Sequence, residues 1–87
     1  MYTKFYSMIE EHKEIVEPVV EAILNTRSSN DVMYIVLDEL KEMYKNYIGN
    51  VVMRKTDGRV HYYLKRQTWI NGKREITSNE IGYYWYE

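Results

Sequence analysis

The stretch from Arg54 to Ile76 reads RKTDGRVHYYLKRQTWINGKREI, and it decides the fold of this 87-residue chain. It holds two turn dipeptides, Asp57-Gly58 and Asn71-Gly72, each flanked by β-branched and aromatic residues. Such dipeptides accept the positive φ angles of a type I′ turn and indicate two-residue β-hairpin loops. The sequence therefore predicts three consecutive antiparallel strands, at about 51–56, 59–70 and 73–86.

The two-residue loops also predict the strand register, with Thr56 opposite Arg59 and Ile70 opposite Lys73. Side chains alternate between the faces of a sheet, so the register separates two surfaces. We expect the apolar face to pack in the core; it holds Val51, Met53, Val60, Tyr62, Leu64, Ile81, Tyr83 and Trp85. The opposite face is basic and aromatic; it holds Arg54, Arg59, His61, Tyr63, Lys65, Trp69 and Arg74, with Val52, Gln67, Ile76 and Tyr84 among them. A bulge near residues 78–82 would exchange the faces of the last strand, and the sequence leaves this alternative open.

The middle strand is longer than the core of so small a domain. A strand over 59–70 spans roughly 40 Å at about 3.4 Å per residue, while the apolar residues on its core face end at Leu64. We therefore predict a projecting β-hairpin arm at about 65–77, with Trp69, Ile70 and Ile76 near its tip. An isolated two-stranded ribbon is marginally stable in water, so we expect the arm to rest on nucleic acid, a second copy or another protein.

The residues before this stretch have helical periodicity. Across residues 4–25 the apolar side chains gather on one side of a helical wheel, opposite an acidic stripe of Glu10, Glu14, Glu17 and Glu21. A second helix is predicted at about 31–48, after the N-cap candidates Ser28, Ser29, Asn30 and Asp31. The predicted fold is a single α+β domain over 1–87, in which an antiparallel helical hairpin packs on a three-stranded antiparallel meander in the order ααβββ.

Composition excludes several classes of function. The chain has no cysteine, so it holds no disulfide, thiolate nucleophile or Cys-based metal site, and we expect a cytoplasmic protein. No apolar run approaches the roughly 18 residues of a membrane span. No Walker loop, dinucleotide fingerprint, His-rich zinc motif or elbow serine appears. We therefore expect no enzymatic activity, no metal, no cofactor and no membrane partner.

The charge is distributed unevenly along the chain. The formal net charge is -1, yet residues 1–50 carry 5 Lys and Arg against 9 Asp and Glu, and residues 51–87 carry 7 against 4. Guanidinium and ammonium groups neutralise phosphates, and exposed rings stack on bases, so this basic ribbon favours nucleic-acid binding. The candidate contacts to DNA or RNA are Arg54, Arg59, His61, Tyr63, Lys65, Arg66, Trp69, Lys73 and Arg74.

Two other interpretations fit the same ribbon. Lys and Arg on a solvated strand face protect sheet edges from aggregation. Alternatively, the chain is a small protein-interaction module, an inhibitor or a homodimer; the candidate contacts are then Trp69, Ile70, Ile76, Tyr84, Tyr86, Tyr34 and Ile35. The acidic stripe could meet a basic partner, although the water-facing side of a helix is the simpler interpretation.

The stretch from Ile48 to Gly82 contains IGNVVMRK, RVHYYLKR and NGKREIT. This order of residue types resembles a helix followed by a basic, Tyr-rich β-hairpin in small uncharacterised archaeal proteins. The resemblance covers about 35 positions without a diagnostic motif. It implies the helix-plus-hairpin layout and no particular activity.

Overall fold

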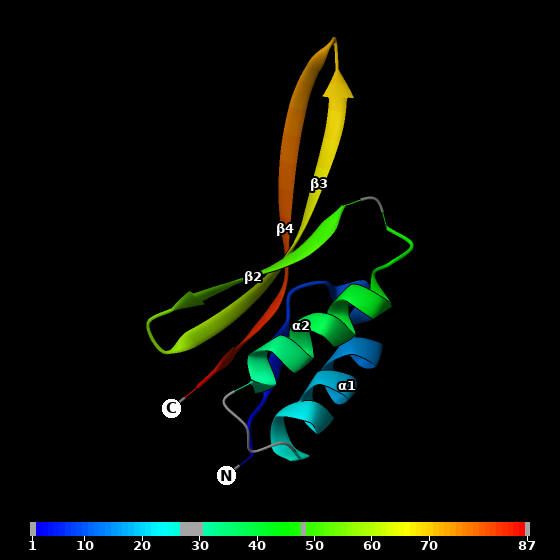
Figure 1. The fold of residues 1–87 in the computed structure, drawn as a ribbon. Helices are drawn as coiled ribbons and strands as arrows, with labels where there is room; N and C mark the ends of the chain where they lie inside the picture. Colours follow the sequence, from blue (N-terminus) through cyan, green and yellow to red (C-terminus); the bar gives the residue numbers. More distant parts are fainter. Residues whose placement is uncertain (1, 27–30, 48, 87) are drawn as a thin grey trace.

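The computed structural model describes residues 2–26, 31–47 and 49–86. Strand β1 (Phe5–Ser7) and a single 3-10 turn, η1 (Glu10–His12), precede helices α1 (Lys13–Thr26) and α2 (Val32–Met43). Strands β2 (Asn50–Thr56), β3 (Arg59–Ile70) and β4 (Lys73–Trp85) follow. The strands form an antiparallel sheet in the order β1-β4-β3-β2, and both helices lie on the same side of it (Figure 1).

The α+β class is confirmed, but the sheet has four strands and not three. Residues 5–7, predicted to be helical, form β1 and pair with the end of β4, with Phe5 opposite Tyr84 and Ser7 opposite Gly82. Helix α1 accordingly begins at Lys13 and not near residue 4. Phe5 falls in phase with the apolar side of the helical wheel, so periodicity could not separate it from α1. Its strand conformation depends on pairing with a segment nearly eighty residues away.

Helix α2 is shorter than predicted. It begins after Asp31, whose carbonyl accepts hydrogen bonds from the N–H groups of Tyr34 and Ile35, and it ends at Met43. The next residues form a turn, in which the Tyr47 N–H donates to the Tyr44 carbonyl at 3.1 Å. The predicted end at residue 48 and the N-cap candidates Ser28, Ser29 and Asn30 lie outside the described residues.

Both turn dipeptides form the predicted two-residue loops, with Thr56 opposite Arg59 and Ile70 opposite Lys73. Asn71 and Gly72 have φ angles of 52° and 77°, as a type I′ turn requires. At the other loop only Gly58, with φ of 82°, is left-handed, and Asp57 is not. The type I′ prediction at Asp57-Gly58 was therefore wrong, although the register it implied is correct.

A β-bulge in β4 decides which of its residues enter the core. The register shifts between Tyr62 and Tyr63, because Tyr62 opposes Gly82 while Tyr63 opposes Glu80. Ile81 is the extra residue, and every residue after it changes face. The prediction of Tyr83 and Trp85 as core residues was therefore wrong, and Tyr84 takes their place with 3% of its surface exposed.

The core lies between the helices and the adjacent sheet face. Phe5 packs over Gly82 so closely that a Cβ atom at position 82 would lie 2.4 Å from the Phe5 Cζ atom. The Tyr62 hydroxyl is buried and donates a 2.8 Å hydrogen bond to the Met33 carbonyl. The buried hydrophobic residues are Phe5, Val16, Val20, Val36, Leu40, Tyr44, Val51, Val60, Tyr62, Leu64, Ile81 and Tyr84.

Side chains of α1 bond the outer edge of β1. The N–H groups of Ser7 and Phe5 donate 3.0 Å hydrogen bonds to the carboxylates of Glu17 and Glu21. One turn further along α1, the Asn25 side chain bonds both the N–H and the carbonyl of Thr3. Four residues along a helix rise about 6 Å, and two residues along a strand rise about 6.8 Å. Every fourth residue of α1 therefore lies beside every second residue of the strand. Glu17 and Glu21 of the acidic stripe therefore accept hydrogen bonds from the edge strand of the sheet. The interpretation of the stripe as a purely water-facing side was wrong.

The predicted arm is present as a long two-stranded ribbon (Figure 1). Strand β2 pairs with β3 only as far as Lys65, and β1 pairs with β4 only from Gly82 onward. Between these limits the described pairs join β3 and β4 alone, up to the Ile70–Lys73 pair. The arm accounts for the elongated shape of the molecule, which measures 50 × 27 × 19 Å.

Stability is expected to fall steeply above about pH 10. Burial raises the pKa of Tyr62, Tyr44 and Tyr84 above the ordinary value near 10. Unfolded tyrosines lose their protons near pH 10 while these three keep theirs, so above that pH the folded state binds more protons and loses stability as the pH rises. A tyrosine that stays protonated in the folded state while its unfolded counterpart is ionised contributes a slope of at most about 1.4 kcal/mol per pH unit.

Urea unfolding between about pH 9 and pH 11 measures this slope. The Tyr62→Phe variant should have a shallower slope, because one buried phenol is gone. If absorbance titration of the folded protein showed all ten tyrosines ionising together near pH 10, the prediction would be wrong.

Candidate nucleic-acid interface

The sheet face opposite the helices is not covered by any described element (Figure 1). We call it the open face. Register and alternation place on it Tyr6 from β1, Val52 and Arg54 from β2, Arg59, His61, Tyr63 and Lys65 from β3, and Glu80, Tyr83 and Trp85 from β4. The open face therefore combines aromatic and cationic side chains from all four strands.

Four rings cross the open face as a continuous ladder. Tyr6 stacks on Tyr83 with ring centroids 5.2 Å apart, and Tyr83 lies 5.4 Å from His61. His61 in turn stacks on Tyr63 at 6.1 Å, with an angle of 19° between the ring planes. Neighbouring rings restrict one another's rotamers, so the ladder presents a preorganised aromatic surface.

Arg59 extends this surface at the end nearest the β2–β3 turn. Its guanidinium carbon lies 4.9 Å from the Trp85 ring centroid and 5.7 Å from that of Tyr83. The two rings meet edge to face, with centroids 6.4 Å apart. A guanidinium held over indole and phenol rings keeps its positive charge beside the stacking surface, where a phosphate could reach it.

A hydrogen bond between His61 and Glu80 lies at the middle of the ladder. The His61 Nδ1–H donates to the Glu80 Oε1 atom at 2.9 Å, and both side chains are largely buried. Across the sheet, Arg54 pairs with His61 and Glu80 pairs with Tyr63. The hydrogen bond from His61 to Glu80 holds the imidazole between Tyr63 and Tyr83.

The open face continues onto the arm through Lys65, Gln67, Trp69, Arg74 and Ile76. At the base of the arm it is hollowed by a cavity of about 390 Å³, whose lining includes Asn50, Val52, Lys65, Gln67 and Ile76. Trp69, near the tip, has 72% of its surface exposed. The arm thus lengthens the surface with further cationic and apolar groups.

The structure brings seven of the nine predicted nucleic-acid contacts onto one face, namely Arg54, Arg59, His61, Tyr63, Lys65, Trp69 and Arg74. Arg66 and Lys73 lie on the opposite side of the ribbon, because they alternate with Lys65 and Arg74. His61 is more buried than expected, with 8% of its surface exposed. It is a member of the ladder and not a freely exposed side chain.

The residues predicted for a protein partner are dispersed. Trp69, Ile70 and Ile76 are exposed on the arm, whereas Tyr34 is exposed on α2 and Ile35 is half-buried there. The prediction of an exposed Tyr84 was wrong, because the bulge turns it into the core. Tyr86 is half-buried, and its hydroxyl donates a 3.1 Å hydrogen bond to the Thr56 carbonyl.

Sequence reasoning missed Tyr6, Tyr83, Trp85 and Glu80 as members of the site. The first lies in the unexpected strand, and the next two reach the open face only through the bulge at Ile81. Gly82 beside the bulge was the available signal, since a strand glycine often marks a bulge or a close approach. Here it marks both.

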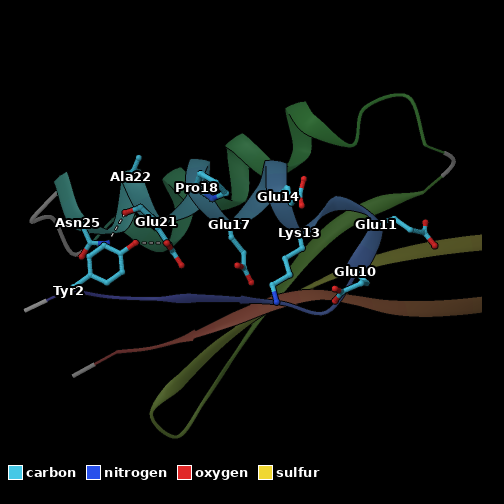
Figure 2. A pocket seen from close by; sticks show the side chains of 10 residues that line it. All are labelled: Tyr2, Glu10, Glu11, Lys13, Glu14, Glu17, Pro18, Glu21, Ala22 and Asn25. Atoms are coloured by element: carbon cyan, nitrogen blue, oxygen red, sulfur yellow. Dashed lines mark hydrogen bonds between the residues drawn. The ribbon is translucent and has the colours of Figure 1, made fainter.

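A second concave surface is lined by α1, η1 and Tyr2 and has a volume of about 910 Å³ (Figure 2). Glu17 and Glu21 point from α1 toward β1, and the Tyr2 hydroxyl donates to Glu21. The remaining charged lining residues are Glu10, Glu11, Lys13 and Glu14. The carboxylates of Glu17 and Glu21 already accept hydrogen bonds from the backbone of β1, so the main role of this groove is to hold β1 against α1.

Neither a metal site nor a membrane span is found in the described part of the chain. No three His, Cys, Asp or Glu side chains there are grouped so that they could hold a metal ion. No helix there is long and apolar enough to cross a membrane.

Comparisons with protein-family models, with curated proteins and with solved structures found no match to this chain.

Proposed function

We propose that this protein binds single-stranded nucleic acid, RNA or DNA, across the open face and along the arm. The observation that carries the proposal is the ladder of Tyr6, Tyr83, His61 and Tyr63, uncovered by any described element. Rings on an uncovered surface bind unpaired bases by stacking, at about 1–3 kcal/mol per base. The bases of a duplex already stack on one another, so the ladder favours a single strand.

The charge of the open face supports the same proposal. Arg54, Arg59, Lys65 and Arg74 surround or continue the ladder, whereas Glu80 is the acid that the described strands place on this face. Cations beside stacked rings let the backbone of a strand be neutralised while its bases stack. No catalytic group is needed for this activity.

Salt dependence tests the proposal directly. A labelled oligonucleotide of about 12 nucleotides is expected to bind in fluorescence anisotropy. For four phosphate contacts its affinity should fall roughly 50-fold between about 50 and 200 mM salt. Binding that ignores salt, or no binding to either RNA or DNA, would contradict the proposal.

A charge variant locates the interface. Changing Arg54→Gln together with Lys65→Gln removes two cations of the open face. The salt slope, which is the decrease of log affinity per unit of log salt concentration, should then fall by about 1.4. The matched control is Lys41→Gln with Lys45→Gln, which removes the same charge from the exposed side of α2 and its following turn. The control variant should keep the wild-type slope; an equal loss in both variants would mean that only net charge matters.

Association with protein through the arm remains the second candidate, favoured by the exposed Trp69, Ile70 and Ile76. An isolated ribbon with apolar side chains gains stability when it is covered. Size-exclusion chromatography with light scattering, at two salt concentrations and with or without oligonucleotide, separates the candidates. A dimer that survives moderate salt and is lost in Trp69→Ala would favour this second function; a monomer that gains the mass of one oligonucleotide would favour the first.

A further inference from the structure

Glu80 is an unexpected residue on a cationic surface. It lies opposite Tyr63 in the sheet, and its Oε1 atom accepts the His61 hydrogen bond at 2.9 Å. Within the part of the chain that the structure describes, its Oε2 atom accepts no hydrogen bond. The other acid of β4, Glu75, pairs with Thr68 and lies on the opposite face of the ribbon.

Phosphate binding does not account for this carboxylate, and the His61 hydrogen bond occupies only its Oε1 atom. A negative charge among Arg54, Arg59 and Lys65 weakens the attraction for a phosphate backbone. The largely buried contact between Glu80 and His61 is in itself weak support for folding, because the cost of desolvating the carboxylate offsets its attraction to the imidazole. The carboxylate does have one capacity that the cations lack: it accepts hydrogen bonds, and each oxygen can accept more than one.

A base stacked on Tyr63 would bring its edge toward Glu80, because the two residues are cross-strand neighbours. Guanine presents two adjacent donors, N1–H and N2–H₂, which match the two oxygens of a carboxylate. Uracil and thymine present a single N–H between two carbonyl groups, which a carboxylate repels. Adenine and cytosine each offer one amino group beside an acceptor nitrogen.

We infer that the open face prefers guanine in a single strand, with Glu80 as the residue that reads the base. This inference rests on the proposed nucleic-acid binding and adds a base preference to it. Tyr63 supplies the stacking surface, and His61 is a positioning residue that holds the Oε1 atom. The surrounding cations bind the backbone without regard to sequence.

The test compares oligothymidines of about 12 nucleotides that differ only at the central base. The wild-type protein is expected to bind the central guanine roughly 5- to 150-fold more tightly than an all-thymine strand. Adenine and cytosine at the same position should fall between these two. Isolated guanines are used so that the oligonucleotides do not form quadruplexes.

Two isosteric variants assign the preference to Glu80. Glu80→Gln should bind all four strands within about threefold of one another, because an amide offers one acceptor and one donor. Glu75→Gln removes the same charge from the opposite face of the same strand and should keep the wild-type preference. Circular dichroism and thermal melting establish that both variants are folded.

The outcomes separate this inference from the function on which it rests. No binding to any of the strands would overturn the proposed function. Binding of all four strands with equal affinity by the wild-type protein would overturn the base preference alone. A guanine preference that survives in Glu80→Gln would overturn the role of Glu80.

Discussion

The Phe5→Ala variant is expected to lose about 3–5 kcal/mol of unfolding free energy. Phe5 is fully buried, packs over Gly82 and contacts the Tyr62 ring at a centroid distance of 6.3 Å. Truncation leaves a cavity bounded by the strand backbone of β4, which cannot collapse without breaking the sheet. The unfolding free energy of a domain is about 5–15 kcal/mol, so this loss is a large part of the total. At about 4 °C or more per kcal/mol, the melting temperature should fall by at least about 12 °C.

Tyr6→Ala is the matched control for this loss. It removes a ring of similar size from the adjacent residue of β1, but from the open face, where 36% of Tyr6 is exposed. We expect a cost of about 1 kcal/mol. Should Phe5→Ala unfold completely, Phe5→Leu keeps the comparison measurable by urea denaturation, with an expected cost between the two. Equal losses in Phe5→Leu and Tyr6→Ala would contradict the placement of Phe5 in the core.

The second large effect concerns the ladder. A variant with Tyr63→Ala and Tyr83→Ala should bind single strands at least about 30-fold more weakly, because each lost stacking contact costs about 1–3 kcal/mol. Anisotropy at a single low salt concentration measures the loss. The salt slope should stay close to wild type, since no cation is removed.

Tyr34→Ala, on the exposed surface of α2, controls for the loss of an exposed tyrosine and should bind normally. Both ladder tyrosines also contact His61, so each variant is first checked for cooperative melting. A folded double variant with wild-type affinity would show that the rings do not contact the strand.

Local signals in the sequence predicted those parts of the fold that depend on neighbouring residues. Asp57-Gly58 and Asn71-Gly72 determined the pairing of β2, β3 and the arm, because a two-residue loop leaves a single register. The shared face of Arg54, His61 and Tyr63 followed from that register. Periodicity identified part of the buried side of the helices, namely Val16 on α1 and Val36 and Leu40 on α2, but it missed the buried Val20.

The remainder depends on contacts between residues distant in sequence. Three residues of β1 are too few to show an alternating pattern, and they become a strand because the edge of β4 is free to pair with them. The bulge forms where Gly82 must pass beneath Phe5, which a pattern within β4 alone does not reveal. Since both features determine the position of Tyr6, Tyr83 and Trp85, half of the aromatic surface became visible only with the tertiary structure.

The hydrogen bonds that Glu17 and Glu21 accept from the backbone of β1 have a consequence for assembly. A sheet polymerises by edge-to-edge growth only when both of its outer strands can accept a neighbour. Here the β1 side of the domain body is closed by helical carboxylates, so main-chain pairing is left to the β2 side. Two copies that paired through their β2 strands would be related by a two-fold axis, and the outer strands of the joined sheet would both be β1. Because helical carboxylates cover the β1 edge, the sheet would not grow beyond the dimer.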